Sequence, residues 1–415
     1  MSQTNILFAS DVSIADIPGG SERVLFEQTR GLVRRGYNVH ILTRKPAGNP
    51  QCFENIAGVK EWRYDIDRRN AGRFLLTTLQ NGKFLFEKLQ NRFRFKCIHM
   101  HQPFTAFALM QSPLSKNIRK IYTCHSLSFE EYISRNRKPG TAWGKMLFFI
   151  HCCGRKHMEK KVLHQADHIM VLSRFTQKKL RNVYRIPLHK ISINPGGADL
   201  KKFFPVQDKR QIRKKLHIPD DKFILFTLRN LEPRMGLENL ILSLKKISEE
   251  IKDIYLIIGG EGPLMEELKK KARQSGTGRY IRFTGYIPEA KLADYYRAAD
   301  FFILPTLELE GFGLVTPESL ASGLPVLGTP VGGTEEILSL FGAGYLFRNT
   351  GPDAIADLIM EKYKKYREDI SSWNQLSEKC RKFAEKYYSW KRNIDFMENI
   401  MKRETEKKSP IVMHL

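Results

Sequence analysis

The segment PTLELEGFGLVTPESLASGLPVLGTPVGGTEE, residues 305–336, carries the pattern that decides the fold. It follows an apolar strand, Asp300-Phe-Phe-Ile-Leu304, and a glycine-rich loop within it leads into a short helix. Glu310 and Glu318 stand eight positions apart, one on each side of the loop-to-helix junction. The turn Gly311-Phe312-Gly313 lets backbone N–H groups approach a ligand closely. A strand, a loop and a helix in this order suit the binding of a phosphorylated sugar.

The two acids and the helix start have different expected roles. Glu318, early in the helix, can accept hydrogen bonds from the vicinal hydroxyls of a ribose, and the sugar ring would lie at Glu310. The helix N-terminus directs the amides of Gly313, Leu314 and Val315 toward anionic oxygens. The alternative is structural, with Glu310 a solvated loop acid and Glu318 an acid that the helix dipole stabilises.

The segment resembles the ExxxxxxxE signature of family 4 of the retaining glycosyltransferases, which have the GT-B fold and are also called glycosyl transferases group 1. The resemblance extends from Pro18-Gly-Gly-Ser-Glu22 through Arg229-Asn-Leu-Glu-Pro-Arg-Met-Gly236 to Gly332-Gly-Thr-Glu-Glu336. It implies transfer of a sugar from a UDP- or GDP-activated donor, with an alpha linkage formed and with no metal or other cofactor. The implied acceptor is a lipid-linked or cell-envelope glycan.

The resemblance also implies roles for single residues. Arg229 matches the arginine that meets the donor diphosphate, His125 the histidine that contacts the donor sugar, and Glu310 the acid that engages the sugar hydroxyls. We expect these three to be catalytic. Met235 occupies the position of the usual phosphate-binding lysine, and the neighbouring Arg234 is the candidate for the missing cation. The expected substrate-binding residues are Gly19, Gly20, Arg234, Gly311, Phe312, Gly313, Leu314, Val315 and Glu318.

In the resembled family the loop at Gly19-Gly20 closes over the donor diphosphate and borders the acceptor. The alternative is a plain N-terminal cap for a helix over Ser21–Arg35. A dinucleotide-binding fingerprint would place GxGxxG directly after the first strand, Asn5–Ser10. Asp11–Pro18 intervenes instead, so the match to a dehydrogenase fails.

Other groups of polar residues have simpler interpretations. His125 alone after a strand is more often structural than catalytic. Asp65-Ile-Asp67 looks like a metal-binding DxD motif but lies in a charged loop of the first domain, so we assign it to solvent and expect no bound metal. His151-Cys-Cys153 with His157 lies in an apolar and basic helical stretch and is interpreted as packed helix surface. The chain offers no obvious second acid for a double displacement, and the resemblance implies a front-face mechanism in which the leaving phosphate helps to deprotonate the acceptor.

Strands and helices alternate along the chain, which indicates parallel sheets covered on both faces. A chain of 415 residues suits two domains. The turn-rich stretch Asn194-Pro-Gly-Gly-Ala-Asp199 separates them, and the same pattern restarts after it. We predict an α/β protein of two tandem doubly wound, Rossmann-like domains with a cleft between them. The expected strands are Asn5–Ser10, Asn38–Thr43, Cys97–His101, Lys120–Cys124 and His168–Leu172, then Lys222–Arg229, Ile254–Gly259, Ile281–Thr284, Asp300–Pro305 and Val326–Gly328.

The resembled fold divides the chain into three parts. Residues 1–195 would form an acceptor-binding domain, and residues 196–385 a domain that binds the nucleotide sugar. Residues 386–415 would hold a helix that crosses back to the first domain, and a tail. We predict this helix over Ser377–Met401 and a frayed tail over Arg403–Leu415.

Positive charge is concentrated in the first domain. Residues 1–195 hold 33 Lys and Arg against 13 Asp and Glu, whereas the remaining residues hold 36 against 31. Such a surface attracts an anionic partner, and nucleic acid is the poorer choice because no nucleic-acid-binding motif accompanies the charge. Arg73–Lys96 and Trp143–Lys161 combine apolar and basic residues in a way that favours an anionic membrane surface. The alternative for both is a helix that packs on its own domain.

We expect a cytoplasmic protein, peripheral on the cytoplasmic face of a membrane. No apolar run approaches the roughly 18 residues that span a bilayer, and the start of the chain lacks the apolar core of a signal peptide. The six cysteines follow no disulfide or zinc spacing, which predicts reduced thiols.

Two further hypotheses remain open. A sugar-nucleotide-binding or scaffold protein without turnover is motivated by Met235. A phosphorylase on the same fold is disfavoured because no lysine is placed like an anchor for pyridoxal phosphate.

Overall fold

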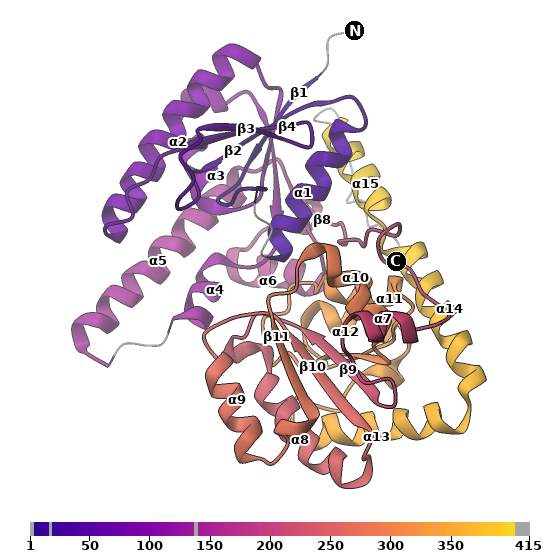
Figure 1. The fold of residues 1–415 in the computed structure, drawn as a ribbon. Helices are drawn as coiled ribbons and strands as arrows, with labels where there is room; N and C mark the ends of the chain where they lie inside the picture. Colours follow the sequence, from indigo (N-terminus) through magenta and orange to yellow (C-terminus); the bar gives the residue numbers. More distant parts are fainter. Residues whose placement is uncertain (1–3, 16–18, 137–139, 403–415) are drawn as a thin grey trace. The chain divides into compact units, whose positions relative to one another are not determined.

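A computed structural model describes residues 4–15, 19–136 and 140–402 of the chain. These residues form two compact units (Figure 1). The N-terminal unit contains the described residues up to Gly196 together with those from Trp390, and the C-terminal unit contains residues 197–389. Pro18 of the predicted donor loop and the predicted tail Arg403–Leu415 lie outside the described residues.

The N-terminal unit is built on an eight-stranded sheet with the strand order β3-β4-β2-β1-β5-β6-β7-β8. Neighbouring strands are parallel except for β3 and β4, which form an antiparallel pair at one edge. The strands are β1 Asn5–Ala9, β2 Asn38–Arg44, β3 Phe53–Ile56, β4 Val59–Tyr64, β5 Cys97–Met100, β6 Arg119–Cys124, β7 His168–Val171 and β8 Ile191–Ile193.

The antiparallel edge corrects the expectation of a purely parallel sheet. Ala57 and Gly58 both have positive φ, 52° and 86°, and they reverse the chain between β3 and β4. Two consecutive residues of this kind form the tight turn that suits an antiparallel hairpin. The strands β3, β4 and β8 are absent from the predicted set, because each is short or mixes polar with apolar residues.

Helices cover the sheet of the N-terminal unit (Figure 1). On the first helix Leu25 and Leu32 are buried, and Val33 is half-buried. The helices are α1 Gly20–Val33, α2 Ala71–Phe93, α3 Pro103–Met110, α4 Ser128–Arg135, α5 Ala142–Gln165, α6 Arg174–Tyr184 and α15 Trp390–Lys402.

The C-terminal unit has a five-stranded parallel sheet with the order β11-β10-β9-β12-β13. Its strands are β9 Phe223–Leu228, β10 Ile254–Gly259, β11 Ile281–Gly285, β12 Phe301–Leu304 and β13 Val326–Gly328. Its helices are α7 Arg210–Lys215, α8 Leu237–Glu250, α9 Met265–Gln274, α10 Glu289–Ala298, α11 Val315–Ala321, α12 Gly332–Phe341, α13 Pro352–Glu368 and α14 Ile370–Tyr387.

The prediction of a single helix over Ser377–Met401 is wrong. The structure has two helices there, α14 and α15, separated at Tyr388 and Ser389. Tyr388 O accepts a hydrogen bond from Ala198 N at 2.8 Å, and Ser389 forms a β-bridge with Ala198. This backbone pairing takes the place of the helical hydrogen bond that would have continued α14.

A buried acid holds the two central strands of the C-terminal unit together. Asp300, which precedes β12, accepts hydrogen bonds from Ile224 N on β9 and from Arg213, both at 2.8 Å. Lys209 adds a second cation at 3.0 Å. Because β9 and β12 are parallel neighbours, the residues that follow them meet at the same edge of the sheet, where parallel α/β sheets bind ligands.

Candidate active site

Arg229 and Glu310 meet at this edge of the C-terminal unit. Arg229 directly follows β9, and Glu310 lies in the loop after β12. The guanidinium Nη2 of Arg229 lies 2.5 Å from Glu310 Oε2 and donates to Thr306 Oγ1 at 3.1 Å. Thr306 in turn donates to Glu310 Oε2 at 3.1 Å. The structure therefore brings two of the three predicted catalytic residues into direct contact.

Both members of this pair are buried, each with 8% of the residue exposed. Burying a charge is costly unless it is paired and hydrogen-bonded, and here each charge offsets the other. Arg229 Nε is also buried and has no hydrogen-bond partner among the described residues. This N–H group is therefore unsatisfied within the described residues.

Met235 stands beside Arg229. It belongs to a short 3-10 turn, Pro233–Met235, and its Sδ lies 2.8 Å from Arg229 Nη2. The neighbouring Arg234 points elsewhere, because its Nη1 donates to Leu309 O at 3.2 Å and its Nε pairs with Glu232 at 3.3 Å. Arg234 thus contacts the backbone just before Glu310, and its predicted role at the phosphates stays a prediction.

Two glycines let neighbouring segments approach the loop that carries Glu310. Gly236 has φ +70°, and a Cβ at this position would overlap the carbonyl oxygen of Pro305. Gly332 has φ +58°, and a Cβ there would overlap the carbonyl oxygen of Glu310 itself. Only glycine combines this backbone conformation with so close an approach. The motifs around residues 229–236 and 332–336 therefore pack closely against the two ends of the 305–310 loop.

The remaining predicted donor-binding residues line the same loop. A Cβ on Gly313 would lie 3.4 Å from the Glu310 carboxyl carbon, so the glycine leaves one side of that carboxylate uncovered by a side chain. Gly311 connects Glu310 to Phe312, whose buried ring packs edge-on against Tyr388 with the centroids 5.8 Å apart. Leu314 and Val315 begin α11, and no side-chain hydrogen bond caps this helix.

Glu318 lies in the first turn of α11 and is 7% exposed. Its Oε2 accepts a hydrogen bond from the Tyr296 hydroxyl at 3.0 Å. Burial, and then the nearby Glu318 carboxylate, raise the pKa of Tyr296 well above its usual value, so this hydroxyl remains a donor. With both acids buried, Glu310 is not the solvated loop acid of the structural alternative, and Glu318 is held in a defined hydrogen bond.

The third predicted catalytic residue, His125, belongs to the N-terminal unit and follows β6. Its Nε2 lies 3.0 Å from Nδ1 of His101, so that one ring donates a hydrogen bond to the other. Burial lowers the pKa of His125 to about 4, which makes the ring neutral near pH 7. His101 was not predicted, although it follows β5, the neighbour of β6 in the sheet. The sequence feature that could have pointed to His101 is a histidine at the end of each of two consecutive predicted strands.

Gly19 and Gly20 lie at the start of α1, where Gly19 is the N-cap with an extended backbone. No side chain caps this helix, and Ser21 Oγ instead donates to the Glu22 carboxylate at 2.8 Å. A Cβ on Gly19 would lie 2.7 Å from that same carboxylate. Gly19 as the N-cap and Glu22 in the first turn agree with the alternative of a plain N-terminal cap for this helix. The role of the loop at the donor stays a prediction.

Asp65 lies in solvent as expected, with its side chain 73% exposed, whereas the Asp67 side chain is 19% exposed. Both acids are ion-paired within their unit. Asp65 binds Lys45 at 2.8 Å, and Asp67 binds Arg69 at 2.6 Å and Arg73 at 3.5 Å. Hydrogen bonds from Arg69 lower the pKa of Asp67. Within residues 4–15, 19–136 and 140–402, no group of three His, Cys, Asp or Glu side chains is placed to hold a metal ion.

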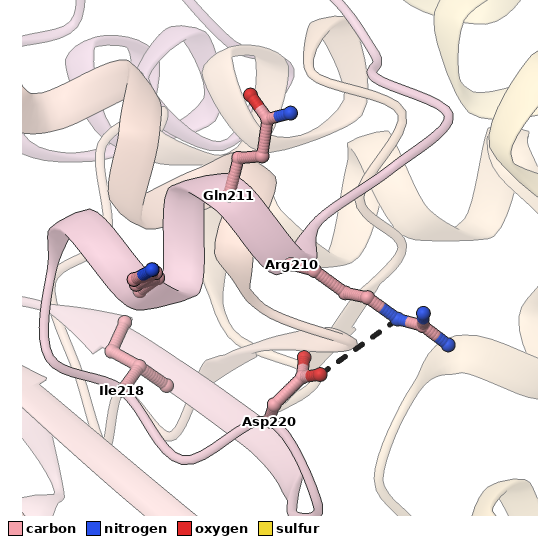
Figure 2. A pocket seen from close by; sticks show the side chains of 5 residues that line it. Arg210, Gln211, Ile218 and Asp220 are labelled. Atoms are coloured by element: carbon pink, nitrogen blue, oxygen red, sulfur yellow. Dashed lines mark ion pairs between the residues drawn. The ribbon is translucent and has the colours of Figure 1, made fainter.

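A hollow of about 420 Å³ lies elsewhere on the C-terminal unit, along α7 (Figure 2). It is lined by Arg210, Gln211, Lys214, Ile218 and Asp220, and Arg210 is paired with Asp220 at 3.8 Å. None of these residues belongs to the predicted site. Four of the five are exposed, and we assign the hollow no part in the reaction.

Two family descriptions match consecutive parts of the chain. Residues 18–202 match the family described as Glycosyltransferase Family 4. Residues 208–387 match the family described as Glycosyl transferases group 1. The chain belongs to the family 4 glycosyltransferases, and its two Rossmann-like units are those of the GT-B fold.

A relative of known name agrees with this assignment. The chain is 29% identical over 206 residues to the GDP-mannose-dependent alpha-(1-6)-phosphatidylinositol monomannoside mannosyltransferase of Mycolicibacterium smegmatis. This match covers 48% of the chain and 54% of the relative, so the chain spans about half the length of that protein.

Two solved structures show the same fold. Sucrose-phosphate synthase from Thermosynechococcus elongatus matches 96% of this chain and 98% of its own, with a TM-score of 0.80 and 22% identity. The Anabaena protein HepE, in complex with UDP, matches 96% of this chain and 99% of its own, with a TM-score of 0.75 and 15% identity.

Proposed function

We propose that this glycosyltransferase moves a sugar from a UDP- or GDP-linked donor to a lipid-linked or cell-envelope glycan acceptor, with retention and formation of an alpha linkage. The observation that carries the proposal is the buried pair Arg229–Glu310 at the carboxyl ends of parallel strands. A buried cation whose Nε–H group has no partner among the described residues would suit a departing diphosphate.

Charge develops on the diphosphate as the bond to the sugar breaks. Arg229 would stabilise this charge in a site that excludes water, where such an interaction is strong. Arg234, anchored to Leu309, is the second candidate cation. In this proposal the two arginines neutralise the phosphates without a metal or another cofactor.

The sugar would lie over the glycine-rich loop. Oε2 of Glu310 is engaged by Arg229 and Thr306, whereas Oε1 lies beside the bare Cα of Gly313. Oε1 would therefore accept hydrogen bonds from the sugar hydroxyls. Glu318 would accept them from the ribose, and the loop through Val315 would follow the donor between them. The leaving phosphate would help to deprotonate the acceptor in a front-face reaction.

The donor and acceptor classes are supported by the relatives. One is named for GDP-mannose and for a phosphatidylinositol-based acceptor, and another was crystallised with UDP. The basic residues of the first 195 positions would hold the protein on an anionic membrane at its cytoplasmic face. Among the described residues, no helix combines the length and the apolar composition that crossing a bilayer requires.

The second candidate is a nucleotide-sugar-binding or scaffold protein that lacks turnover. Met235 favours it, because a buried thioether stands beside Arg229 where a phosphate-binding lysine is usual in the family. A thioether cannot neutralise a phosphate.

A donor panel separates the two candidates. The full chain is incubated with UDP-glucose, UDP-galactose, UDP-N-acetylglucosamine and GDP-mannose, with and without a bacterial lipid extract, and the released UDP or GDP is measured. Turnover with one donor, increased by the extract and lost in Glu310→Gln but kept in Arg210→Ala, is the expected result. Saturable donor binding without released nucleotide in any mixture would establish the scaffold instead.

A further inference from the structure

The first half of α5 exposes large apolar side chains. Five of them, between 40% and 67% exposed, lie within eight consecutive residues. Soluble proteins rarely leave such a contiguous group in water unless it meets a partner. We call this group the α5 apolar patch, and its members are Trp143, Met146, Leu147, Phe149 and Ile150.

The patch is held on a firm support. The second half of α5 buries Met158, Val162 and Leu163 in the N-terminal unit. Before that, Phe148 packs on Tyr132 of α4 with the ring centroids 5.3 Å apart. The guanidinium carbon of Arg155, also on α5, lies over the same Tyr132 ring, 4.6 Å from its centre. The helix is therefore anchored to its unit while its first half presents the patch.

All exposed charges of α5 are positive. Lys145 lies within the patch, and Lys156, Lys160 and Lys161 follow it along the helix, all exposed. The only acid of α5, Glu159, is fully buried and hydrogen-bonded to Tyr184.

The acids of the neighbouring helix α4 are already engaged. Glu130 pairs with Lys179, and Glu131 accepts a hydrogen bond from Ser126. The patch therefore combines exposed apolar side chains with lysines for which no ion pair is found among the described residues. Two such surfaces repel each other, which disfavours a second copy of this chain as the partner.

We propose that the α5 apolar patch inserts into the interface of an anionic phospholipid bilayer. Trp and Phe suit the depth of the headgroups, Met, Leu and Ile suit the start of the acyl chains, and the lysines attract anionic headgroups. α4 begins two residues after Ser126, so the supporting helix starts close to His125. The proposal rests on the proposed function only in that a lipid-linked acceptor would lie in the same bilayer.

Vesicle binding tests the proposal without any need for turnover. The full chain is floated with vesicles of phosphatidylcholine alone or mixed with phosphatidylglycerol. The test variant is Trp143→Ser/Phe149→Ser/Ile150→Ser. The matched control is Leu242→Ser/Leu340→Ser on the C-terminal unit, where the side chains are 40% and 43% exposed. Thermal unfolding and donor hydrolysis by each variant report on folding and on the proposed function separately.

We expect the wild type and the control on the C-terminal unit to bind the anionic vesicles, and the α5 variant to bind at least about tenfold more weakly with an unchanged melting temperature. Brominated acyl chains should quench wild-type tryptophan fluorescence, and Trp143→Phe should remove most of that quenching.

Three results of the vesicle experiment would overturn the proposal, and so would one change in oligomeric state. They are no binding of the wild type, equal binding of the α5 variant, and equal binding of the wild type to both vesicle types. A wild-type dimer that becomes monomeric in the α5 variant would assign the patch to a protein interface instead.

Discussion

Arg229 has a structural role in its pair with Glu310, and the proposed function gives the same side chain a chemical role. Its contact with Glu310 satisfies two buried charges, and its Nε group is left without a partner among the described residues. Removing either partner leaves the other buried and unpaired, which is costly. Loss of activity in a variant of this pair must therefore be separated from loss of stability.

Arg229→Ala should lower kcat by about 10²–10³-fold, because one donor to the developing charge is lost. Arg229→Lys keeps the charge but lacks the planar guanidinium with its fixed N–H donors, and we expect it to recover only part of the activity. Steady-state kinetics with the active donor measure both variants below their melting temperatures. Wild-type kcat in a folded Arg229→Ala variant would remove Arg229 from the reaction.

Gly236→Ala should destabilise the C-terminal unit, because the new methyl group would meet Pro305 O at a backbone conformation unsuited to alanine. Gly276→Ala is the matched control, since Gly276 has φ +73°, close to the +70° of Gly236, and no atom of the described residues lies within 4 Å of the place where its Cβ would stand. The free energy of unfolding in urea should fall by at least about 2 kcal/mol more for Gly236→Ala. Equal losses would mean that the 305–310 loop adapts to the methyl group.

The sequence indicated the candidate residues but not the contacts that the structure shows between them. Arg229, Glu310 and Glu318 follow from the glycine-rich motifs around them. The direct pairing of Arg229 with Glu310, across 81 positions of chain, depends on β9 and β12 being neighbours. His101 was missed because strand order, which places it beside His125, is not visible in local spacing.

At the scale of elements, α4 and α5 are joined by a buried acid. Both carboxylate oxygens of Glu159, on α5, accept from Ser128 N at the start of α4 at 3.1 Å. The Tyr184 hydroxyl donates to the same carboxyl group. Burial raises the pKa of Glu159 to about 7.

This pKa gives stability a definite dependence on pH. The folded-state pKa of about 7 lies above the ordinary value of 4.5, so the unfolded chain releases this proton first as pH rises. The contribution of Glu159 to stability is complete below pH 4.5 and is lost as pH rises through about 7. Glu159→Gln cannot titrate, so its stability relative to the wild type should rise over this interval by up to about 3 kcal/mol. Urea unfolding at several pH values measures the difference, and a constant difference would contradict the raised pKa.

Elements were predictable where hydrophobic residues formed continuous runs, and less so elsewhere. β9 and β10 are buried apolar strands, and their predicted bounds agree with the structure to within one residue. The β3–β4 hairpin was missed because its strands are short and carry charged residues. The break between α14 and α15 depends on backbone pairing with Ala198, distant in sequence, and helical periodicity continues across it.

At the scale of the whole molecule, the last described helix completes the first unit. On α15, Asn393 Oδ1 accepts from Gln28 at 2.9 Å, and its Nδ2 donates to Pro195 O at 2.7 Å. Gly31 of α1 allows close contact with Ile394, since a Cβ there would overlap the isoleucine side chain. Helices from the two ends of the described chain are therefore parts of one hydrogen-bonded core.

Asn393→Ala should lower the free energy of unfolding of the N-terminal unit by about 1–3 kcal/mol, because it leaves buried polar groups on Gln28 and Pro195 unpaired. Lys391→Ala, on the exposed side of the same helix, should change it little. Hydrogen exchange of α1 amides reports the effect locally. Unchanged protection in Asn393→Ala would mean that α15 does not stabilise this unit.

The two-unit α/β architecture followed from the alternation of strands and helices along the chain, and the family comparisons agree with it. Donor, acceptor and linkage depend on loop side chains that no general pattern specifies. Their identity therefore has to come from experiments on the protein itself.

A crystal structure of the full chain with UDP or GDP tests the central claim most directly. The account predicts ribose hydroxyls within hydrogen-bonding distance of the Glu318 carboxylate and a phosphate oxygen on the Arg229 guanidinium. A nucleotide bound with its ribose and phosphates away from both residues would contradict it.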